Sequence, residues 1–159
     1  VERNTMTYNA AVSACEKGAQ WVQALQLVRH MTVSQVAKNA ITYNAAVSAY
    51  EKGAQWVQAL QLFREMADGR VERNLISYSA AVSACEKCTQ WVQALQLFRE
   101  MADDQIERNT ISYSTAVSAC EAGEQWVKAL QLFREMADGR VERNTLTYGA
   151  AVSACEKGQ

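Results

Sequence analysis

The sequence contains no proline, a single histidine and almost no net charge. Without proline, no pyrrolidine ring interrupts a helix anywhere in the chain. The 16 lysines and arginines against 17 aspartates and glutamates leave a formal charge of −1, which provides no basic footprint for a strongly electrostatic nucleic-acid binder. No apolar run approaches the roughly 18 residues of a membrane-spanning helix, so we expect no membrane insertion. No signal or transit peptide is recognisable at Val1, so the sequence itself indicates no compartment.

The histidine and cysteine content supplies no complete metal site. A structural zinc site needs four ligands, and only Cys85 and Cys88 have the Cys-x-x-Cys spacing of such a site. Four of the five cysteines recur at one place in a repeat, which indicates small buried core residues: Cys15, Cys85, Cys120 and Cys155. The sequence also lacks a Ser/His/Asp set and a glycine-rich phosphate loop. We therefore predict no catalytic residue, no metal and no cofactor.

Self-similarity with a period of 35 residues dominates the sequence. Residues 40–74 and 75–109 are identical at 26 of 35 positions. Tyrosine, tryptophan and asparagine recur at this period, at Tyr8, Tyr43, Tyr78, Tyr113 and Tyr148; at Trp21, Trp56, Trp91 and Trp126; and at Asn4, Asn39, Asn74, Asn109 and Asn144. The pattern defines repeats 1 to 4 at 5–39, 40–74, 75–109 and 110–144, with the first helix of a fifth at 145–159. Residues 1–4 match the end of a repeat, and both ends cut through the pattern, so we expect a longer array.

The pattern of apolar residues within each repeat predicts two helices. In the first helix of repeat 2, apolar residues share one face at i, i+3, i+4 and i+7: Tyr43, Ala46, Val47 and Tyr50. Asn39 stands where an N-cap is expected, and Gly53 follows the last turn as a C-terminal stop would. The second helix carries an apolar stripe of Trp56, Ala59, Leu60, Phe63 and Met66, and it ends at Gly69.

A single helical pair cannot bury these stripes alone, whereas stacked repeats cover one another. The predicted fold class is all-α, a right-handed α-solenoid of helix–turn–helix repeats. Repeat 1 deviates most, because Val28 replaces the Phe63-type residue, so we expect its stability to depend on its neighbours. We expect the tryptophans in the core between helices. His30, which replaces the Glu65-type residue, is expected on an exposed face.

The 35-residue period, with "TYN" opening the first helix and "ALQLFREM" closing the second, resembles the pentatricopeptide repeat (PPR) family. The resemblance covers the whole chain. The related tetratricopeptide repeat differs, with a period of 34 and a Trp-x-x-Leu-Gly pattern. The resemblance implies binding of single-stranded RNA, one base per repeat, in a mitochondrion or chloroplast. The implied partner is an organellar transcript, and no small-molecule substrate is implied.

In this family, the residue after the first helix's tyrosine and the last residue of the repeat select the base. The corresponding pairs are Asn9 with Asn39, Asn44 with Asn74, Ser79 with Asn109, and Ser114 with Asn144. The family associates Asn–Asn with pyrimidines and Ser–Asn with adenine, which implies a preference for 5′-pyrimidine-pyrimidine-A-A-3′. The exchange of Asn44 for Ser79 would then change the base on a constant scaffold, because an amide and a hydroxyl reach a Watson–Crick edge differently.

Two further sets complete the implied site. Apolar residues before the Thr/Ser-Tyr pair would stack on base faces: Met6, Ile41, Ile76, Ile111 and Leu146. Lysines two helical turns after the base-selecting residue would meet phosphates: Lys17, Lys52, Lys87 and Lys157. The chain departs from the family pattern in three respects. The proline usual before the last residue is replaced by Lys38, Arg73, Arg108 or Arg143; Ala122 replaces a lysine; and Gly149 takes the fifth base-selecting position.

Each set also has a simpler explanation. Helix capping alone accounts for the asparagines that end the repeats. Core packing is the alternative for the residues assigned to stacking, and a solvated helix face is the alternative for the lysines. At the level of function, the alternative is a scaffold that contacts protein subunits of a large organellar assembly. The near-zero charge favours the scaffold, whereas the Asn-to-Ser exchanges favour RNA.

Overall fold

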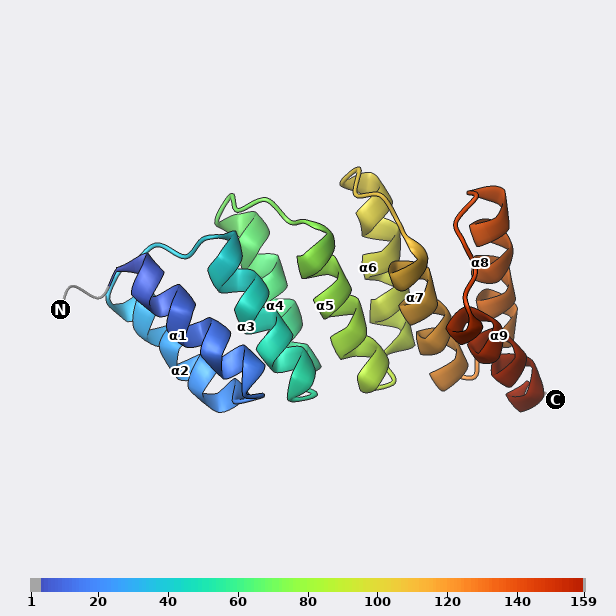
Figure 1. Ribbon diagram of the computed structural model, residues 1–159, viewed down its shortest axis with the longest axis horizontal. Coiled ribbons are helices and arrows are strands. Elements are labelled where there is room, and N and C mark those ends of the chain that lie inside the picture. Colours follow the sequence, from blue (N-terminus) through green and yellow to red (C-terminus); the bar gives the residue numbers. More distant parts are fainter. Residues whose placement is uncertain (1–3, 159) are drawn as a thin grey trace. The chain divides into compact units, whose positions relative to one another are not determined.

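The computed structural model describes residues 4–158, and every regular element in this range is an α-helix (Figure 1). The nine helices of this range are α1 (Thr5–Lys17), α2 (Trp21–Val33), α3 (Ala40–Lys52), α4 (Trp56–Asp68), α5 (Leu75–Lys87), α6 (Trp91–Asp103), α7 (Thr110–Ala122), α8 (Trp126–Asp138) and α9 (Thr145–Lys157). The odd-numbered helices are the first helices of the repeats. The prediction of an all-α fold built from helix–turn–helix repeats is confirmed. None of these helices is long and apolar enough to span a membrane.

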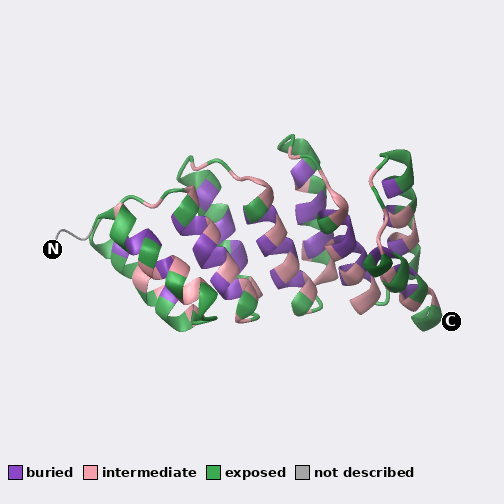
Figure 2. Ribbon diagram, in the orientation of Figure 1, coloured by how far each residue is buried: buried purple, intermediate pink, exposed green. Residues whose placement is uncertain are grey.

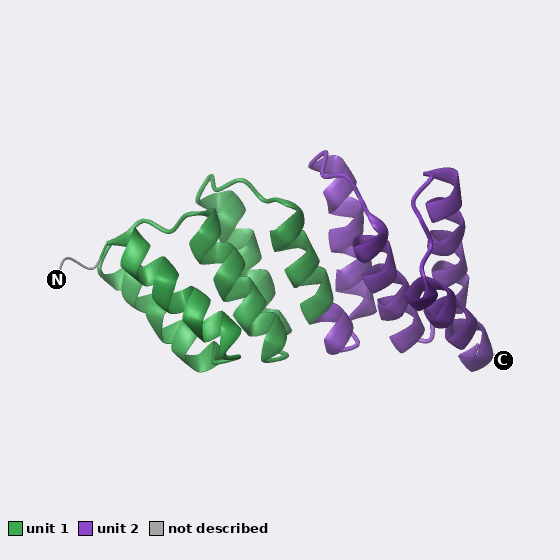
Figure 3. Ribbon diagram, in the orientation of Figure 1, with its two compact units in different colours: residues 1–84 green, residues 85–159 purple. Residues whose placement is uncertain are grey.

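The chain forms two compact units, residues 1–84 and 85–159, and the division falls within α5 (Figure 3). In unit 1, α1 packs against α2 and α3, and α3 packs against α2 and α4. In unit 2, α7 packs against α6, α8 and α9, and α8 contacts α9. Within each unit, the first helix of one repeat therefore lies against the first helix of the next.

Burial follows the predicted helical stripes (Figure 2). On α3 and α4 the predicted residues Tyr43, Ala46, Val47, Tyr50, Ala59, Leu60, Phe63 and Met66 are all buried. Of the recurring cysteines, Cys85 and Cys120 are buried, whereas Cys15 and Cys155, in the first and last helices of the described range, are half-buried. Repeated core positions therefore bury the same side chain to a degree that depends on whether a neighbouring repeat covers it.

The helices end near the predicted glycines, yet glycine is not the residue that turns the chain. Helix α3 ends with Gly53 as C-cap at φ −84°, and the next residue, Ala54, has φ 52°. Ala54 N–H donates to the Glu51 carbonyl and Gln55 N–H donates to the Tyr50 carbonyl, which together form a Schellman motif. Eight turns use a non-glycine residue with positive φ in this way: Ala19, Gln35, Ala54, Arg70, Thr89, Gln105, Glu124 and Arg140.

Gly53 is instead required by the close approach of a tryptophan. A Cβ atom on Gly53 would lie 2.4 Å from Cδ1 of Trp21, the first residue of α2. Within unit 2, Gly123 and Gly158 have the same relation to Trp91 and Trp126. Trp21, Trp91 and Trp126 thus pack between helices, as expected, but they lie against these glycines between repeats and not in the fully buried core, since Trp21 and Trp91 are half-buried and Trp126 is 42% exposed.

Candidate nucleic-acid interface

The asparagines that end the repeats cap the first helices. Asn39 is extended (φ −118°), and its Oδ1 accepts a hydrogen bond from Thr42 N–H at 3.1 Å. Thr42 Oγ1 accepts in return from Asn39 N–H at 3.2 Å, which completes a capping box. The same side-chain cap starts α1, α5, α7 and α9, from Asn4, Asn74, Asn109 and Asn144. Capping is thus a property of these residues whatever else they bind.

The cap fixes the orientation of each amide. Only the oxygen can accept from a backbone N–H, so Oδ1 faces the helix and Nδ2 is left as the donor for other partners. The asparagine Oδ1 also meets the residue after the preceding tyrosine, through Asn9 Nδ2–Asn39 at 3.1 Å, Asn44 Nδ2–Asn74 at 3.5 Å and Ser114 Oγ–Asn144 at 3.5 Å. In repeats 1, 2 and 4 the structure therefore brings together the predicted base-selecting pair. In repeat 3, Ser79 lies half-buried on α5 and Asn109 caps α7.

The residues predicted to stack on bases lie on the surface, in the first turns of the odd-numbered helices. Their exposed fractions are 79% for Met6, 59% for Ile41, 60% for Ile76, 65% for Ile111 and 71% for Leu146. Core packing, the alternative explanation, is excluded by this exposure. An exposed apolar side chain thus recurs at the same place in the first turn of each first helix.

Two of the four predicted phosphate-binding lysines, Lys52 and Lys157, link consecutive repeats. Lys52 Nζ donates to Glu16 Oε1 at 2.8 Å and to the Glu16 carbonyl at 3.0 Å. Lys157 Nζ lies 2.5 Å from Glu121 Oε1. Lys17 and Lys87 are exposed in the last turns of α1 and α5. At Lys52 and Lys157, a phosphate would therefore compete with a glutamate that already occupies the ammonium group.

Glu121 shows that this ionic contact is well formed. The hydrogen bond from Lys157 is the largest influence and lowers the pKa of Glu121, aided by Ser153, against the opposing effect of burial. Ser153 Oγ donates to Glu121 Oε1 at 2.9 Å, and Ser83 Oγ donates to Glu51 Oε1 at 3.0 Å. Glutamates at the ends of the first helices thus accept hydrogen bonds from the next repeat.

An aromatic clamp between repeats was not predicted from the sequence. The guanidinium carbon of Arg73 lies 5.1 Å from the ring centroid of Phe63 and 5.5 Å from that of Tyr78, while the two rings meet edge to face at 4.8 Å. Unit 2 repeats the clamp with Phe98, Arg108 and Tyr113, and with Phe133, Arg143 and Tyr148. The arginine, which stands where the family usually has proline, makes a cation–π contact and immediately precedes the capping asparagine.

The contact from repeat 1 to repeat 2 has a different chemistry. Val28 stands in place of the phenylalanine, and Lys38, in place of the arginine, lies 5.5 Å from the ring centroid of Tyr43. Lys38 also forms an ion pair with Glu65. We call this contact the first junction, and that of Phe63, Arg73 and Tyr78 the second junction. A signal for the clamp was present in the sequence, because phenylalanine and arginine are absent together from the same repeat.

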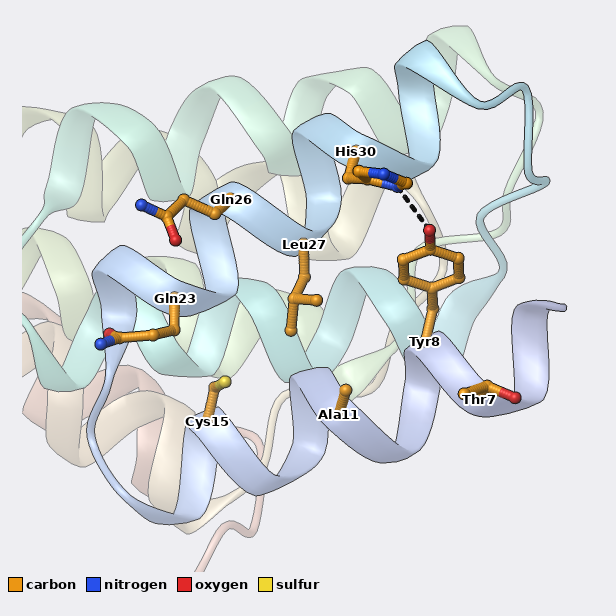
Figure 4. A pocket seen from close by; sticks show the side chains of 8 residues that line it. All are labelled: Thr7, Tyr8, Ala11, Cys15, Gln23, Gln26, Leu27 and His30. Carbon is orange, nitrogen blue, oxygen red and sulfur yellow. Dashed lines mark hydrogen bonds between the residues drawn. The ribbon is translucent and has the colours of Figure 1, made fainter. Parts of the chain in front are cut away.

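His30 is exposed, as expected, but its ring contacts a tyrosine of the first helix. Its Nδ1 lies 2.5 Å from Tyr8 Oη. Both residues line a hollow of about 580 Å³ between α1 and α2 (Figure 4). In repeat 2, Tyr43 Oη donates to Glu65 Oε1 at 3.2 Å. Burial, followed by the charge of Glu65 and this hydrogen bond, raises the pKa of Tyr43 to about 12. Histidine and glutamate therefore fill the same role of partner to the tyrosine hydroxyl.

Cys85 and Cys88 are not joined in a disulfide bond. Burial is the main cause that raises the pKa of Cys85 to about 12, so this thiol stays protonated and unreactive at neutral pH. In the range 4–158, no group of three or more His, Cys, Asp or Glu side chains is placed to hold a metal ion.

Comparison with known proteins identifies the repeat. A model of the pentatricopeptide repeat domain matches residues 26–87 and 96–157, and a model of the PPR repeat matches residues 76–106. A search of curated proteins finds no match. Solved structures are similar over nearly the whole chain. The crystal structure of the maize pentatricopeptide repeat protein PPR10 has a TM-score of 0.83 at 19% identity and covers 97% of this chain and 22% of that one.

Some of the similar structures contain RNA. PPR10 in complex with an 18-nucleotide psaJ RNA element has a TM-score of 0.78 at 19% identity and covers 97% of this chain and 23% of that one. The PPR domain of Arabidopsis thaliana protein-only RNase P 1, in complex with tRNA, has a TM-score of 0.83 at 12% identity. The match covers 98% of this chain and 82% of that one. This chain thus spans about a fifth of the maize protein. With family models matching most of its residues, the chain belongs to the pentatricopeptide repeat family.

Proposed function

We propose that this chain binds single-stranded RNA through the first turns of its odd-numbered helices and selects one base per repeat. The observation that carries the proposal is the exposed apolar residue beside each capped asparagine, as with Ile41 beside Asn39. The apolar side chain stacks on a base face while the neighbouring polar groups reach the base edge. The related structures that contain RNA support the same use of the fold. The RNA is an organellar transcript in a mitochondrion or chloroplast, and binding involves no catalysis.

The expected base order for repeats 1 to 4 is 5′-pyrimidine-pyrimidine-A-A-3′. Each capping asparagine presents Nδ2 as a donor, which suits the carbonyl acceptors of pyrimidines, N3 of cytosine and N1 of adenine. The residue after the tyrosine then distinguishes the bases, with the amides of Asn9 and Asn44 in repeats 1 and 2 and the shorter hydroxyls of Ser79 and Ser114 in repeats 3 and 4. Gly149 provides no side chain for this purpose in the fifth.

Binding should be weak for this chain alone. Stacking contributes roughly 1–3 kcal/mol of binding free energy per base. The ordering of the strand and the association of two molecules together cost several kcal/mol, which offsets part of this gain. Four bases then give a dissociation constant in the micromolar range or weaker. Because Lys52 and Lys157 are already paired with glutamates, we expect fewer phosphate contacts than repeats, and a salt dependence shallower than about −0.7 per repeat in log–log slope.

Replacement of Ser79 by Asn tests the proposal. The variant should move preference at the third base from adenine toward pyrimidine and leave the other three bases unchanged, measured by titrating RNAs that differ only at that base. Ser34→Asn, in the exposed turn after α2, is the matched control and should change no preference. If neither wild type nor Ser79→Asn distinguishes the third base, base selection by these residues is wrong.

A scaffold function is the second candidate, because the second helices carry their own exposed apolar row. Val22, Val57, Val92 and Val127 are exposed at the second residue of α2, α4, α6 and α8. Such a row fits protein subunits of a large organellar assembly. If Val57→Asp weakens a protein complex purified from the organelle while Ile41→Asp leaves it intact, and no RNA binds at low salt, the scaffold function replaces RNA binding.

A further inference from the structure

Asn9 and Asn44 are equivalent in sequence but differ in their hydrogen bonds. Asn9 uses both ends of its amide: Nδ2 donates to Asn39 Oδ1 at 3.1 Å, and Oδ1 accepts from Thr42 Oγ1 at 2.5 Å. Asn44 has only the long contact from Nδ2 to Asn74 Oδ1 at 3.5 Å. Its Oδ1 is buried and has no hydrogen-bond partner among residues 4–158. Two repeats with the same base-selecting pair therefore offer different groups to a base.

The difference arises from one side chain in the following repeat. Thr42, the third residue of α3, directs its hydroxyl to Asn9. Ser77, the third residue of α5, donates instead to the Asn74 carbonyl at 2.8 Å. Threonine at this position can direct its hydroxyl either way. Thr147, which follows Ser114 and not an amide, donates to the Asn144 carbonyl at 2.8 Å. Thr42, which follows the amide of Asn9, is the threonine whose hydroxyl reaches the preceding repeat among the described hydrogen bonds.

We propose that Thr42 is a positioning residue that restricts repeat 1 to donating hydrogen bonds, and that its replacement by Ser77 lets repeat 2 also accept one. This inference rests on the proposed binding of RNA. With Oδ1 of Asn9 occupied, the remaining Nδ2 hydrogen and the Nδ2 of Asn39 are donors, which match N3 and O2 of cytosine. Uracil has an N3–H donor at the same place, and for it repeat 1 keeps only the second lone pair of an oxygen that Thr42 already holds in position.

Repeat 2 has the opposite property. The oxygen of Asn44 is an acceptor without a partner, and a buried acceptor of this kind is stabilised by any donor that reaches it. The 3.5 Å contact to Asn74 is at the limit of a hydrogen bond, so the amide can turn its oxygen toward a base at small cost. The N3–H of uracil is the matching donor. Repeat 1 thus selects cytosine, and repeat 2 selects uracil.

Reciprocal exchange of the two residues tests this assignment. Wild type should prefer cytosine at the first base and uracil at the second. Thr42→Ser should move the first base toward uracil by about five- to tenfold, the factor of one net hydrogen bond, and leave the second unchanged. Ser77→Thr should move the second base toward cytosine by a similar factor. Thr147→Ser is the control, because repeat 4 has Ser114 at the base-selecting position and Thr147 already donates to the Asn144 carbonyl. This change should leave the preference at the fourth base as it is.

A second measurement does not depend on RNA. In wild type, the side-chain NH₂ protons of Asn9 should exchange with water more slowly than those of Asn44 in NMR spectra, and Thr42→Ser should abolish the difference. Equal exchange of the two amides in wild type overturns the proposal. If the exchange differs as expected but no RNA shows any base preference, the proposed function fails instead. If RNA is selected but the swaps leave cytosine and uracil unchanged, RNA binding stands and the role of Thr42 is wrong.

Discussion

The first and second junctions join helices of the same lengths with different chemistry. At the first junction, Val28 is small and Lys38, whose side chain is 11% exposed, forms an ion pair with Glu65, whose side chain is 46% exposed. At the second, Phe63 is 1% exposed and packs edge to face on Tyr78, with the arginine across both rings. An ion pair with one partner open to solvent contributes little and is partly screened by salt, whereas the contribution of buried aromatic surface is not screened.

The comparison shows that an ion pair can replace the aromatic contact between repeats without a change in the backbone of the repeat. Helices α2 and α4 both have 13 residues and both end in the same type of turn. Repeat 1 therefore keeps the geometry of a repeat with less buried surface, and its stability depends more on salt. Four predictions follow from the residues of the two junctions, and they are given in order of decreasing expected effect.

The largest effect is expected at the second junction. Phe63→Ala should lower the free energy of unfolding by about 3–5 kcal/mol, because it removes a buried ring and leaves a cavity. The matched change at the first junction, Val28→Ala, should cost only about 1–2 kcal/mol, since it removes about two methylene equivalents. Urea unfolding of both variants measures the difference. Equal losses would show that the aromatic clamp adds nothing.

The next effect concerns a steric contact of the first junction. Gly53→Ala should destabilise by about 1–3 kcal/mol, because its Cβ would collide with Trp21 and force the indole or α2 to move. Gly149→Ala is the control: no atom lies within 4 Å of its added Cβ, and replacing glycine inside a helix should stabilise by about 0.5–1 kcal/mol. Thermal denaturation of the two variants should give shifts of opposite sign. A neutral Gly53→Ala would refute the packing explanation.

A smaller effect separates the two cations. Arg73→Lys should cost about 0.5–1 kcal/mol, because an ammonium cannot lie flat across two rings as a guanidinium does. The same change at Arg64, exposed on α4, should be neutral. Denaturation in low and high salt extends the comparison, since Lys38→Ala should lose its effect in high salt whereas Arg73→Lys should keep it. Loss of both effects in high salt would make the two junctions alike.

The smallest effect at neutral pH lies in the hydroxyl of Tyr43. Its folded pKa is raised from 10 to about 12, so the folded state favours the protonated phenol. This contribution is complete below pH 10 and is lost as the pH rises from 10 to 12. Tyr43→Phe should therefore lose less stability than wild type in that window, measured by denaturation at each pH. Tyr50, raised to about 12 mainly by burial, titrates in both proteins and cancels in the difference.

Local features of the sequence predicted the fold well. The 35-residue period is visible in the sequence itself, and the helical stripes and the capping asparagines depend on residues close together in the chain; all appear in the structure. The reason for Gly53 could not be predicted, because it depends on the distance to Trp21 in another repeat. The exposure of Ile41 was equally open, because a residue in a first turn can face the core or the solvent.

The candidate site was predicted in its members but not in its hydrogen bonds. The pairing of Asn9 with Asn39 followed from the family resemblance, and the structure places the two side chains in contact. The hydroxyl of Thr42 could not be assigned, since threonine at this position already serves the capping box. Arg73 was a departure from the family's proline until its two aromatic neighbours were placed beside it.

The side-chain cap of Asn39 restricts how such a protein can change its target. A residue that starts the next helix must carry a short acceptor, and only Asn, Asp, Ser and Thr supply one. Folding therefore limits the last position of each repeat to these four residue types, independently of which base is bound. The position after the tyrosine carries no such duty, as Asn44, Ser79 and Gly149 illustrate. New target sequences can thus arise by single substitutions there, one base at a time, without loss of the cap on the helix that follows.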